Sequence, residues 1–205
     1  MPEAFVQPVV SVIIPVRNMA YMLPSALMSV RQQTFTKFEV IVVDDASTDV
    51  SYNVAQEFSE HDPRIRVIRL EENVGAPSAF NAGLDRAQGR YIAHLAADDY
   101  WLSDFLERCV RSLRLNPRAV GAYTDFVLRQ EGGSKEWRVP DFDRKQLMLE
   151  DYVNFSALLM RYPVMLDPRK EPVSDWDALL RLTAHGPLVH VREVCAVRRM
   201  HNKQI

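Results

Sequence analysis

Short apolar runs recur along the first half of the chain, and segments with helical spacing separate them. The runs are rich in β-branched residues and predict strands over residues 9–14, 38–43, 65–70 and 91–95. Two of them, VVSVII and FEVIVV, are almost continuously apolar, which is typical of strands buried on both faces of a sheet.

The segments between these runs carry apolar residues at the i, i+3, i+4 and i+7 positions of a helix. Four helices are predicted, over residues 23–30, 50–58, 76–87 and 102–113. Ser47 or Thr48 is the expected cap of the second helix and Ser103 that of the fourth. This β-α-β-α-β-α-β-α order predicts an α/β fold with a mainly parallel sheet, helices on both faces and right-handed crossovers.

The pattern weakens after residue 120. A strand is expected at 121–123, a turn or hairpin tip at 131–134, and two short apolar segments at 188–191 and 194–197. An amphipathic helix is expected to begin near Ser174 and to stop at Gly186-Pro187. The length of 205 residues suits one domain, and the chain can be part of a longer protein.

Composition excludes several classes of protein. Apolar residues make up 47% and charged residues 25%, with 25 basic and 27 acidic side chains and a formal charge of −2, so nothing attracts nucleic acid. No apolar run approaches the ~20 residues of a membrane span, and we expect a cytoplasmic protein. Cys109 and Cys195 are the only cysteines and are expected to be reduced core residues. Neither a dinucleotide fingerprint nor a P-loop is present.

Polar residues follow each of the four predicted strands, at the edge where open parallel sheets bind ligands. They are Pro15-Val16-Arg17-Asn18, Asp44-Asp45-Ala46-Ser47, residues 71–75 and Asp98-Asp99. Acidic residues crowded in one crevice repel each other unless a cation is present, and carboxylate oxygens suit Mg²⁺ or Mn²⁺, which could also neutralise a diphosphate. Taken singly, each segment has a plainer interpretation as a turn or a helix cap.

The sequence resembles the family 2 glycosyltransferases of the GT-A fold, close in plan to the small, soluble spore-coat type. The matching text is VSVIIPVRN (10–18), SVRQQTFTKFEVIVVDDASTD (29–49), DPRIRVIRLEENVGAPSAFNAGLDRAQGRYIAHLAADD (62–99) and, more loosely, SDWDALLRL (174–182). The resemblance implies a GT-A type sheet with a smaller mixed acceptor-side subregion. Residues 1–116 would be the donor-binding half and 117–205 the acceptor-binding half of one domain.

The same resemblance implies roles for particular residues. Pro15, Val16, Arg17 and Asn18 would form the first donor loop, Asp45 would bind the base, typically uracil, and Gly75 to Asn81 would border the nucleotide. Asp98 and Asp99 would occupy the metal and ribose-phosphate position, with Asp99 as the principal ligand of Mn²⁺ or Mg²⁺. Asp175 would be the general base, with Asp177 as the weaker candidate, and His201 would lie near the diphosphate.

The chain departs from the family pattern at four positions. Ala96 stands where many relatives have the first aspartate of a D-x-D-D motif, so Asp98 and Asp99 must serve alone. Arg17 replaces an aromatic residue that stacks on the base, although a guanidinium plane can also stack. Phe80 replaces an arginine and Ser174 a glutamate.

The resemblance implies an inverting, metal-assisted enzyme that moves a sugar from a nucleoside diphosphate donor, most simply a UDP-sugar, to a saccharide or other hydroxyl acceptor. Two alternatives stay open. A nucleotidyltransferase has a related acidic site but usually needs a glycine-rich basic loop, which is missing after the first predicted strand. A non-catalytic nucleotide-sugar-binding module is favoured by Ala96 and disfavoured by Asp98, Asp99 and Asp175. The sugar, the acceptor and the oligomeric state are not encoded in any recognisable pattern.

Overall fold

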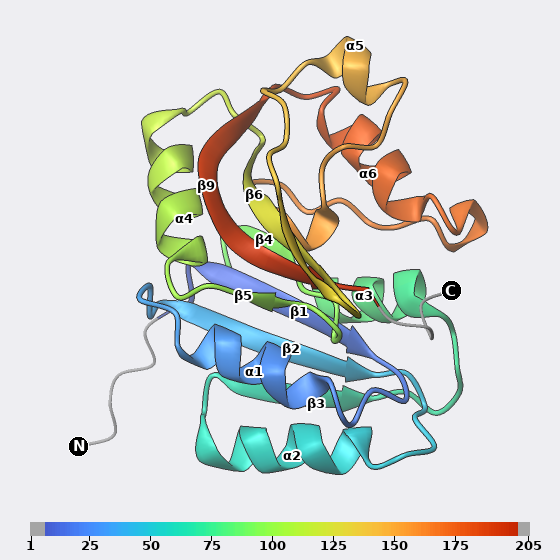
Figure 1. Ribbon diagram of the computed structural model, residues 1–205. Coiled ribbons are helices and arrows are strands. Elements are labelled where there is room, and N and C mark those ends of the chain that lie inside the picture. Colours follow the sequence, from blue (N-terminus) through green and yellow to red (C-terminus); the bar gives the residue numbers. More distant parts are fainter. Residues whose placement is uncertain (1–6, 201–205) are drawn as a thin grey trace.

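The computed structural model describes residues 7–200. The four apolar runs of the first half form the parallel part of a nine-stranded sheet, in the order β3-β2-β1-β4 (Figure 1). These strands are β1 (Val10–Val16), β2 (Phe38–Asp44), β3 (Ile65–Arg69) and β4 (Tyr91–His94). Every residue of β1 and β2 is buried, as their apolar sequences predict.

Helices cover both faces of this parallel region. The chain moves from β1 to β2 to β3 in one direction and then returns past β1 to β4, so right-handed crossovers put α1 and α2 on one face and α3 on the other (Figure 1). Their bounds are α1 (Leu23–Arg31), α2 (Ser51–His61) and α3 (Ala76–Leu84). Gly83 lets α3 approach the sheet closely, because a Cβ at this position would lie 2.5 Å from the Ile13 side chain.

The second half extends the same sheet with mixed pairing. Its strands are β5 (Tyr100–Trp101), β6 (Gly121–Gln130), β7 (Gly133–Trp137), β8 (Leu158–Met160) and β9 (Leu188–Arg199). β8 is antiparallel to both β4 and β6, β9 runs parallel to β6, and β5 is antiparallel to β9. β6 and β7 form a hairpin at the predicted tip. The predicted α/β architecture, with a mainly parallel sheet and a smaller mixed subregion, is therefore confirmed.

The helical segments of this half are α4 (Phe105–Leu115), α5 (Arg144–Leu147) and α6 (Ser174–Leu182), with 3₁₀ turns η1 (Phe155–Ala157) and η2 (Pro168–Lys170). α4 packs against β6, β8 and β9. α6 begins at the predicted Ser174, on the side of the molecule that carries α5 (Figure 1).

Several local predictions are wrong. The N-cap of α2 is Val50, and Ser47 instead accepts a hydrogen bond from the backbone N–H of Asn18 (3.1 Å). The N-cap of α4 is Asp104, one residue after the expected Ser103. The segments 188–191 and 194–197 belong to the single strand β9, whose apolar pattern is interrupted where its pairing with β6 shifts register.

One hydrophobic core runs through both halves of the chain, from β1 and β2 to β6 and β9. Cys109 and Cys195 are buried free thiols, as expected. Within residues 7–200, no helix has the length and apolarity needed to cross a membrane.

Candidate active site

The ends of the parallel strands meet at one edge of the sheet. Val16 pairs with Asp44 and Asp44 with Arg69, so β1, β2 and β3 end at the same level. Leu95 donates to the carbonyl of Ile13 (3.0 Å), which places the segment after β4 beside β1. The strand order reverses between β1 and β4, the position at which open α/β sheets bind ligands. The predicted convergence of the four polar loops is confirmed.

The first loop is tied to the second through Asn18. Its Oδ1 accepts hydrogen bonds from the backbone N–H of Thr48 (2.8 Å) and of Asp49 (3.3 Å). Asn18 has φ of 52°, in the left-handed region that asparagine tolerates better than most residues. Pro15 and Val16 are buried strand residues, so only their backbone could face a nucleotide, whereas Arg17 and Asn18 are exposed. The side chain available for stacking here is therefore Arg17.

Asp45 fixes the loop that follows β3. Its Oδ1 accepts from the backbone N–H of Val74 (2.8 Å) and its Oδ2 from that of Gly75 (3.0 Å), although the carboxylate is buried. Gly75 precedes α3 and has φ of 85°, a conformation that favours glycine. Each carboxylate oxygen can accept more than one hydrogen bond, so Asp45 can still receive a further donor. The predicted base contact and the Gly75 border thus belong to one connected unit.

Asp98 and Asp99 form a buried acidic pair in the connection between the end of β4 and β5. The Arg199 backbone N–H donates to Asp99 Oδ1 (3.0 Å), and the Arg199 guanidinium donates to the carbonyl oxygen of Asp98. Burial raises the pKa of Asp99 to about 7, and the charge of Asp98 adds to this rise. The end of β9 therefore supplies positive charge and a backbone donor to this pair.

Ser156 adds a second support to Asp99. Its hydroxyl donates to the Asp99 carboxylate and accepts from the backbone N–H of Ala96 (3.2 Å). Ser156 is buried in η1, and its carbonyl accepts from the indole N–H of Trp101 (2.6 Å). A residue of the divergent second half thus holds the loop in which Ala96 replaces the usual aspartate.

Asp98 and Asp99 are the residues that would hold a divalent cation, with further ligands from a donor. Within residues 7–200, no cluster of three Asp, Glu, His or Cys side chains could hold a metal ion. Mg²⁺ and related ions are nevertheless commonly held by one or two carboxylates together with substrate phosphates. Asp98 and Asp99 supply adjacent hard oxygen ligands at the ligand-binding edge, so these residues suit a metal that a diphosphate completes.

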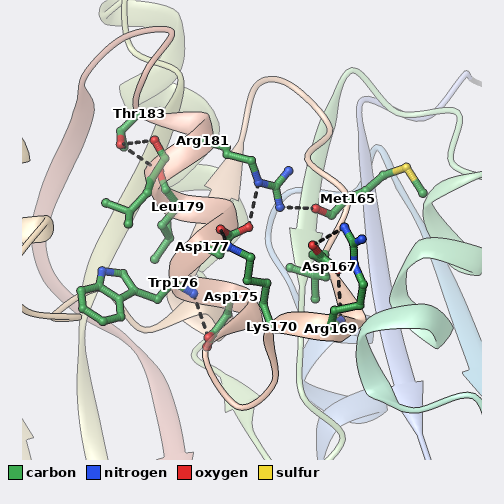
Figure 2. Close-up of polar contacts among 12 residues, drawn as sticks. Met165, Asp167, Arg169, Lys170, Asp175, Trp176, Asp177, Leu179, Arg181 and Thr183 are labelled. Atoms are coloured by element: carbon green, nitrogen blue, oxygen red, sulfur yellow. Dashed lines mark hydrogen bonds and ion pairs between the residues drawn. The ribbon is translucent and has the colours of Figure 1, made fainter.

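Asp175 and Asp177 lie in the first turn of α6 but have different surroundings (Figure 2). Asp177 forms ion pairs with Lys170 (3.1 Å) and Arg181 (2.9 Å). Within residues 7–200, Asp175 Oδ1 accepts from the neighbouring Trp176 N–H (2.8 Å), and its side chain points away from those ion pairs (Figure 2). Of the two carboxylates, Asp177 is the one whose ion pairs hold α6, whereas Asp175 forms no ion pair with another residue of 7–200.

Asp151 and Arg198 interact electrostatically with the candidate catalytic and metal-binding carboxylates. Partial loss of solvation raises the pKa of Asp151 to about 6, and the negative charge of Asp175 adds to this rise. Arg198 lowers the pKa of both Asp151 and Asp99. Asp151 thus lies within electrostatic range of Asp175 and of Arg198, and Arg198 also lies within range of the buried Asp99.

Asn81 is bonded to the second half of the chain. Its amide makes two hydrogen bonds to the backbone of Leu166, and its predicted place beside the nucleotide has no separate support. Ser156, Asp151, Arg198 and Arg199 were not nominated from the sequence. Arg198 and Arg199 belong to the stretch VRRMHN (197–202), in which the resemblance gave a role to His201 alone. His201 lies outside the described residues.

Comparisons with known proteins agree with this geometry. Residues 11–163 match the family described as Glycosyl transferase family 2. The chain is 38% identical over 128 residues to the proposed teichuronic acid biosynthesis glycosyltransferase TuaG of Bacillus subtilis, covering 62% of this chain and 50% of the relative. It is 29% identical over 203 residues to a chondroitin synthase of Escherichia coli, covering 96% of this chain and 29% of the relative. The chain thus spans half or less of both relatives.

Solved structures share the fold. S. aureus TarS 1–349 in complex with UDP-GlcNAc has a TM-score of 0.81 at 17% identity, covering 95% of this chain and 59% of that one. The mannosyltransferase PcManGT of Pyrobaculum calidifontis, in complex with GDP-Man and Mn²⁺, has a TM-score of 0.73 at 19% identity, covering 99% and 60%. Together with the sequence match over residues 11–163, these likenesses lead to one conclusion: the chain belongs to glycosyl transferase family 2 and has the GT-A fold.

Proposed function

We propose that this chain transfers a sugar from a nucleoside diphosphate donor to a hydroxyl acceptor, with inversion at the sugar carbon. The observation that carries the proposal is the placement of Asp175. It lies in the first turn of α6, and it makes neither of the ion pairs that hold Asp177. Residues 1–116 bind the donor in this proposal, and residues 117–205 provide the acceptor side.

The nucleotide is proposed to be uridine diphosphate. Asp45 can accept the ring N–H of a pyrimidine while it holds the loop at Gly75, and the exposed Arg17 can stack on the base. TarS was solved with UDP and with UDP-GlcNAc, which supports this assignment, whereas PcManGT was solved with GDP-Man. The discriminating residues of this chain are therefore Asp45 and Arg17.

Asp99, assisted by Asp98, would hold Mn²⁺ or Mg²⁺. When bound, such an ion neutralises negative charge on the diphosphate leaving group. Arg198 and Arg199 bring further positive charge to the same edge, and Ser156 keeps the Asp99 carboxylate in place. In this proposal Asp98 and Asp99 bind the ion and Ser156 orients the Asp99 carboxylate. The two arginines balance the negative charge of the acidic pair and of the diphosphate.

Asp175 is proposed to accept the proton of the attacking hydroxyl. The acceptor oxygen forms a bond to the sugar carbon as the bond from that carbon to the diphosphate oxygen breaks. The proton moves to the Asp175 carboxylate, and the nucleoside diphosphate leaves. A single displacement of this kind inverts the configuration and requires no covalent nucleophile. The saccharide or other hydroxyl acceptor would enter on the α6 side.

A product assay separates the proposal from its alternatives. The wild-type chain is incubated with a panel of UDP-sugars, Mn²⁺ and candidate saccharide acceptors, and the released nucleotide product is identified. Release of UDP that depends on Asp175 supports the proposal. Release of pyrophosphate from a sugar phosphate and UTP would indicate a nucleotidyltransferase, and donor binding without any release would indicate a binding module. The proposal retains the cytoplasmic location predicted from the sequence.

A further inference from the structure

A short segment joins the donor-side helix α3 to the helix that carries Asp175. We call residues 165–170 the strap; it includes η2 and lies between α3 and α6. Asn81 of α3 donates from Nδ2 to the carbonyl of Leu166 (2.8 Å), and its Oδ1 accepts from the Leu166 backbone N–H (2.8 Å). Leu166 is itself buried. The amide of Asn81 thus pairs with one strap residue in both directions, which fixes the position of the strap on α3.

The other side of the strap is fixed to α6 (Figure 2). The Arg181 guanidinium donates to the carbonyl of Met165 (2.7 Å) and also to Asp177 (2.9 Å). Lys170, at the end of the strap, donates to the other oxygen of Asp177 (3.1 Å). The strap therefore contacts α6 at both of its ends, and Asp177 is the shared partner.

Asp175 and Asp177 are two positions apart on one helix, so they point in different directions (Figure 2). A helix is rigid over a single turn, and anchoring Asp177 therefore also sets the direction of Asp175. The N-terminus of α3 is held in turn, because Gly75 donates to Asp45. A continuous set of bonded contacts then runs from the base-binding carboxylate through α3 and the strap to the general base.

We propose that Asn81 is a positioning residue, which sets the location of Asp175 relative to the bound donor by clasping the strap to α3. This inference rests on the proposed function of Asp175. In this proposal the Asn81 amide does not contact the nucleotide. By holding Leu166, it sets where Asp175 meets the acceptor hydroxyl. A misplacement of about 1 Å in a reacting group can cost ~10²-fold in rate. Loss of the clasp should therefore lower kcat without weakening donor binding.

Asn81→Ala removes both hydrogen bonds, and Asn81→Asp keeps the acceptor for the Leu166 N–H but not the donor for its carbonyl. Asn116→Ala is the matched control, because the Asn116 amide also bonds a backbone carbonyl, that of Ser112 (2.9 Å), at α4 and away from the strap. Each variant is assayed well below its melting temperature for UDP affinity, for kcat and KM, and for backbone hydrogen exchange of residues 165–183.

Asn81→Ala is expected to lower kcat by ~10–10²-fold, to leave UDP affinity within about twofold and to speed exchange in the strap and α6. Asn81→Asp should lower kcat and speed exchange as well, because its carboxylate repels the Leu166 carbonyl, and Asn116→Ala should match the wild type in all three measurements. A fall in UDP affinity with kcat unchanged would overturn the proposal, since Asn81 would then contact the nucleotide. Unchanged kcat and exchange would overturn it as well, as would a lower kcat with unaltered exchange. The proposed function is tested separately, because it would be refuted by a wild-type chain that shows no transfer activity. The results with the Asn81 variants test only the positioning role.

Discussion

Replacement of Asp45 by alanine tests the link between loop architecture and nucleotide binding. The carboxylate accepts backbone hydrogen bonds from Val74 (2.8 Å) and Gly75 (3.0 Å). Each hydrogen bond to a charged group contributes ~1.5–3 kcal/mol to stability. The net loss in the variant is smaller than the sum of the two, because water can bond the freed N–H groups in this half-exposed loop and because the variant no longer buries a carboxylate. We expect Asp45→Ala to lower the free energy of unfolding by about 2–3 kcal/mol, or ~4–12 °C in Tm for a domain of this size.

The same variant should weaken UDP binding by a further ~1–3 kcal/mol, or roughly 5–150-fold, because the ring N–H loses its acceptor and the loop before α3 is released. Asp143→Ala is the matched control, since Asp143 also accepts two backbone N–H bonds, from Lys145 (2.7 Å) and Gln146 (3.4 Å), but at α5. UDP affinity is measured by isothermal titration calorimetry and stability by thermal unfolding. Undiminished UDP affinity in a destabilised Asp45→Ala would refute the base contact, and an unchanged Tm would refute the loop argument.

Two further predictions concern the metal and pH. Asp99→Ala should weaken Mn²⁺-dependent donor binding by more than about tenfold, measured as loss of thermal stabilisation by UDP with Mn²⁺, and turnover that resists EDTA in the wild type would contradict the metal assignment. The pKa of Asp62 is lowered below its ordinary value of 3.8, chiefly by hydrogen bonds from Arg64, so its contribution to stability is present above that value and is lost as pH falls through the lower folded pKa. The stability difference between wild type and Arg64→Ala should accordingly shrink below pH 3.8, and a difference that grows there in acid denaturation would contradict this sign.

The fold of the first half follows from local sequence signals. The runs VVSVII and FEVIVV are apolar enough to specify buried parallel strands, and their order with the intervening helices leaves few topologies. In the second half, β9 was missed as one strand because Arg192 and Glu193 interrupt its apolar pattern at the irregularity where its pairing with β6 shifts register, and the pairing resumes at Val194. Side-chain pattern and backbone pairing are separate properties, and only the first is visible in a sequence.

The candidate site was predictable only where it depends on strand ends. Asp45, Asp98 and Asp99 follow apolar runs and could be placed at one edge of the sheet. Ser156 could not be found in this way, because its contact with Asp99 spans two halves of the chain and no spacing rule relates them. Long-range polar contacts of this kind depend on tertiary packing. The same holds for the Ser47 hydroxyl, which is used by Asn18 and not by the helix it was expected to cap.

The most direct test of the central claim is the transfer rate of Asp175→Asn measured together with its UDP affinity. The substitution keeps the shape of the side chain and an acceptor for the Trp176 N–H (2.8 Å in the wild type), but removes the proton acceptor. Our account predicts a loss of ~10²–10⁴ in kcat with UDP affinity nearly unchanged, and a much milder loss for Asp177→Asn, whose carboxylate holds Lys170 and Arg181. If Asp175 only stabilises the first turn of α6, the variant would instead lose a few tenths to ~1 kcal/mol of stability and keep its turnover. That result would contradict the claim that Asp175 is the general base.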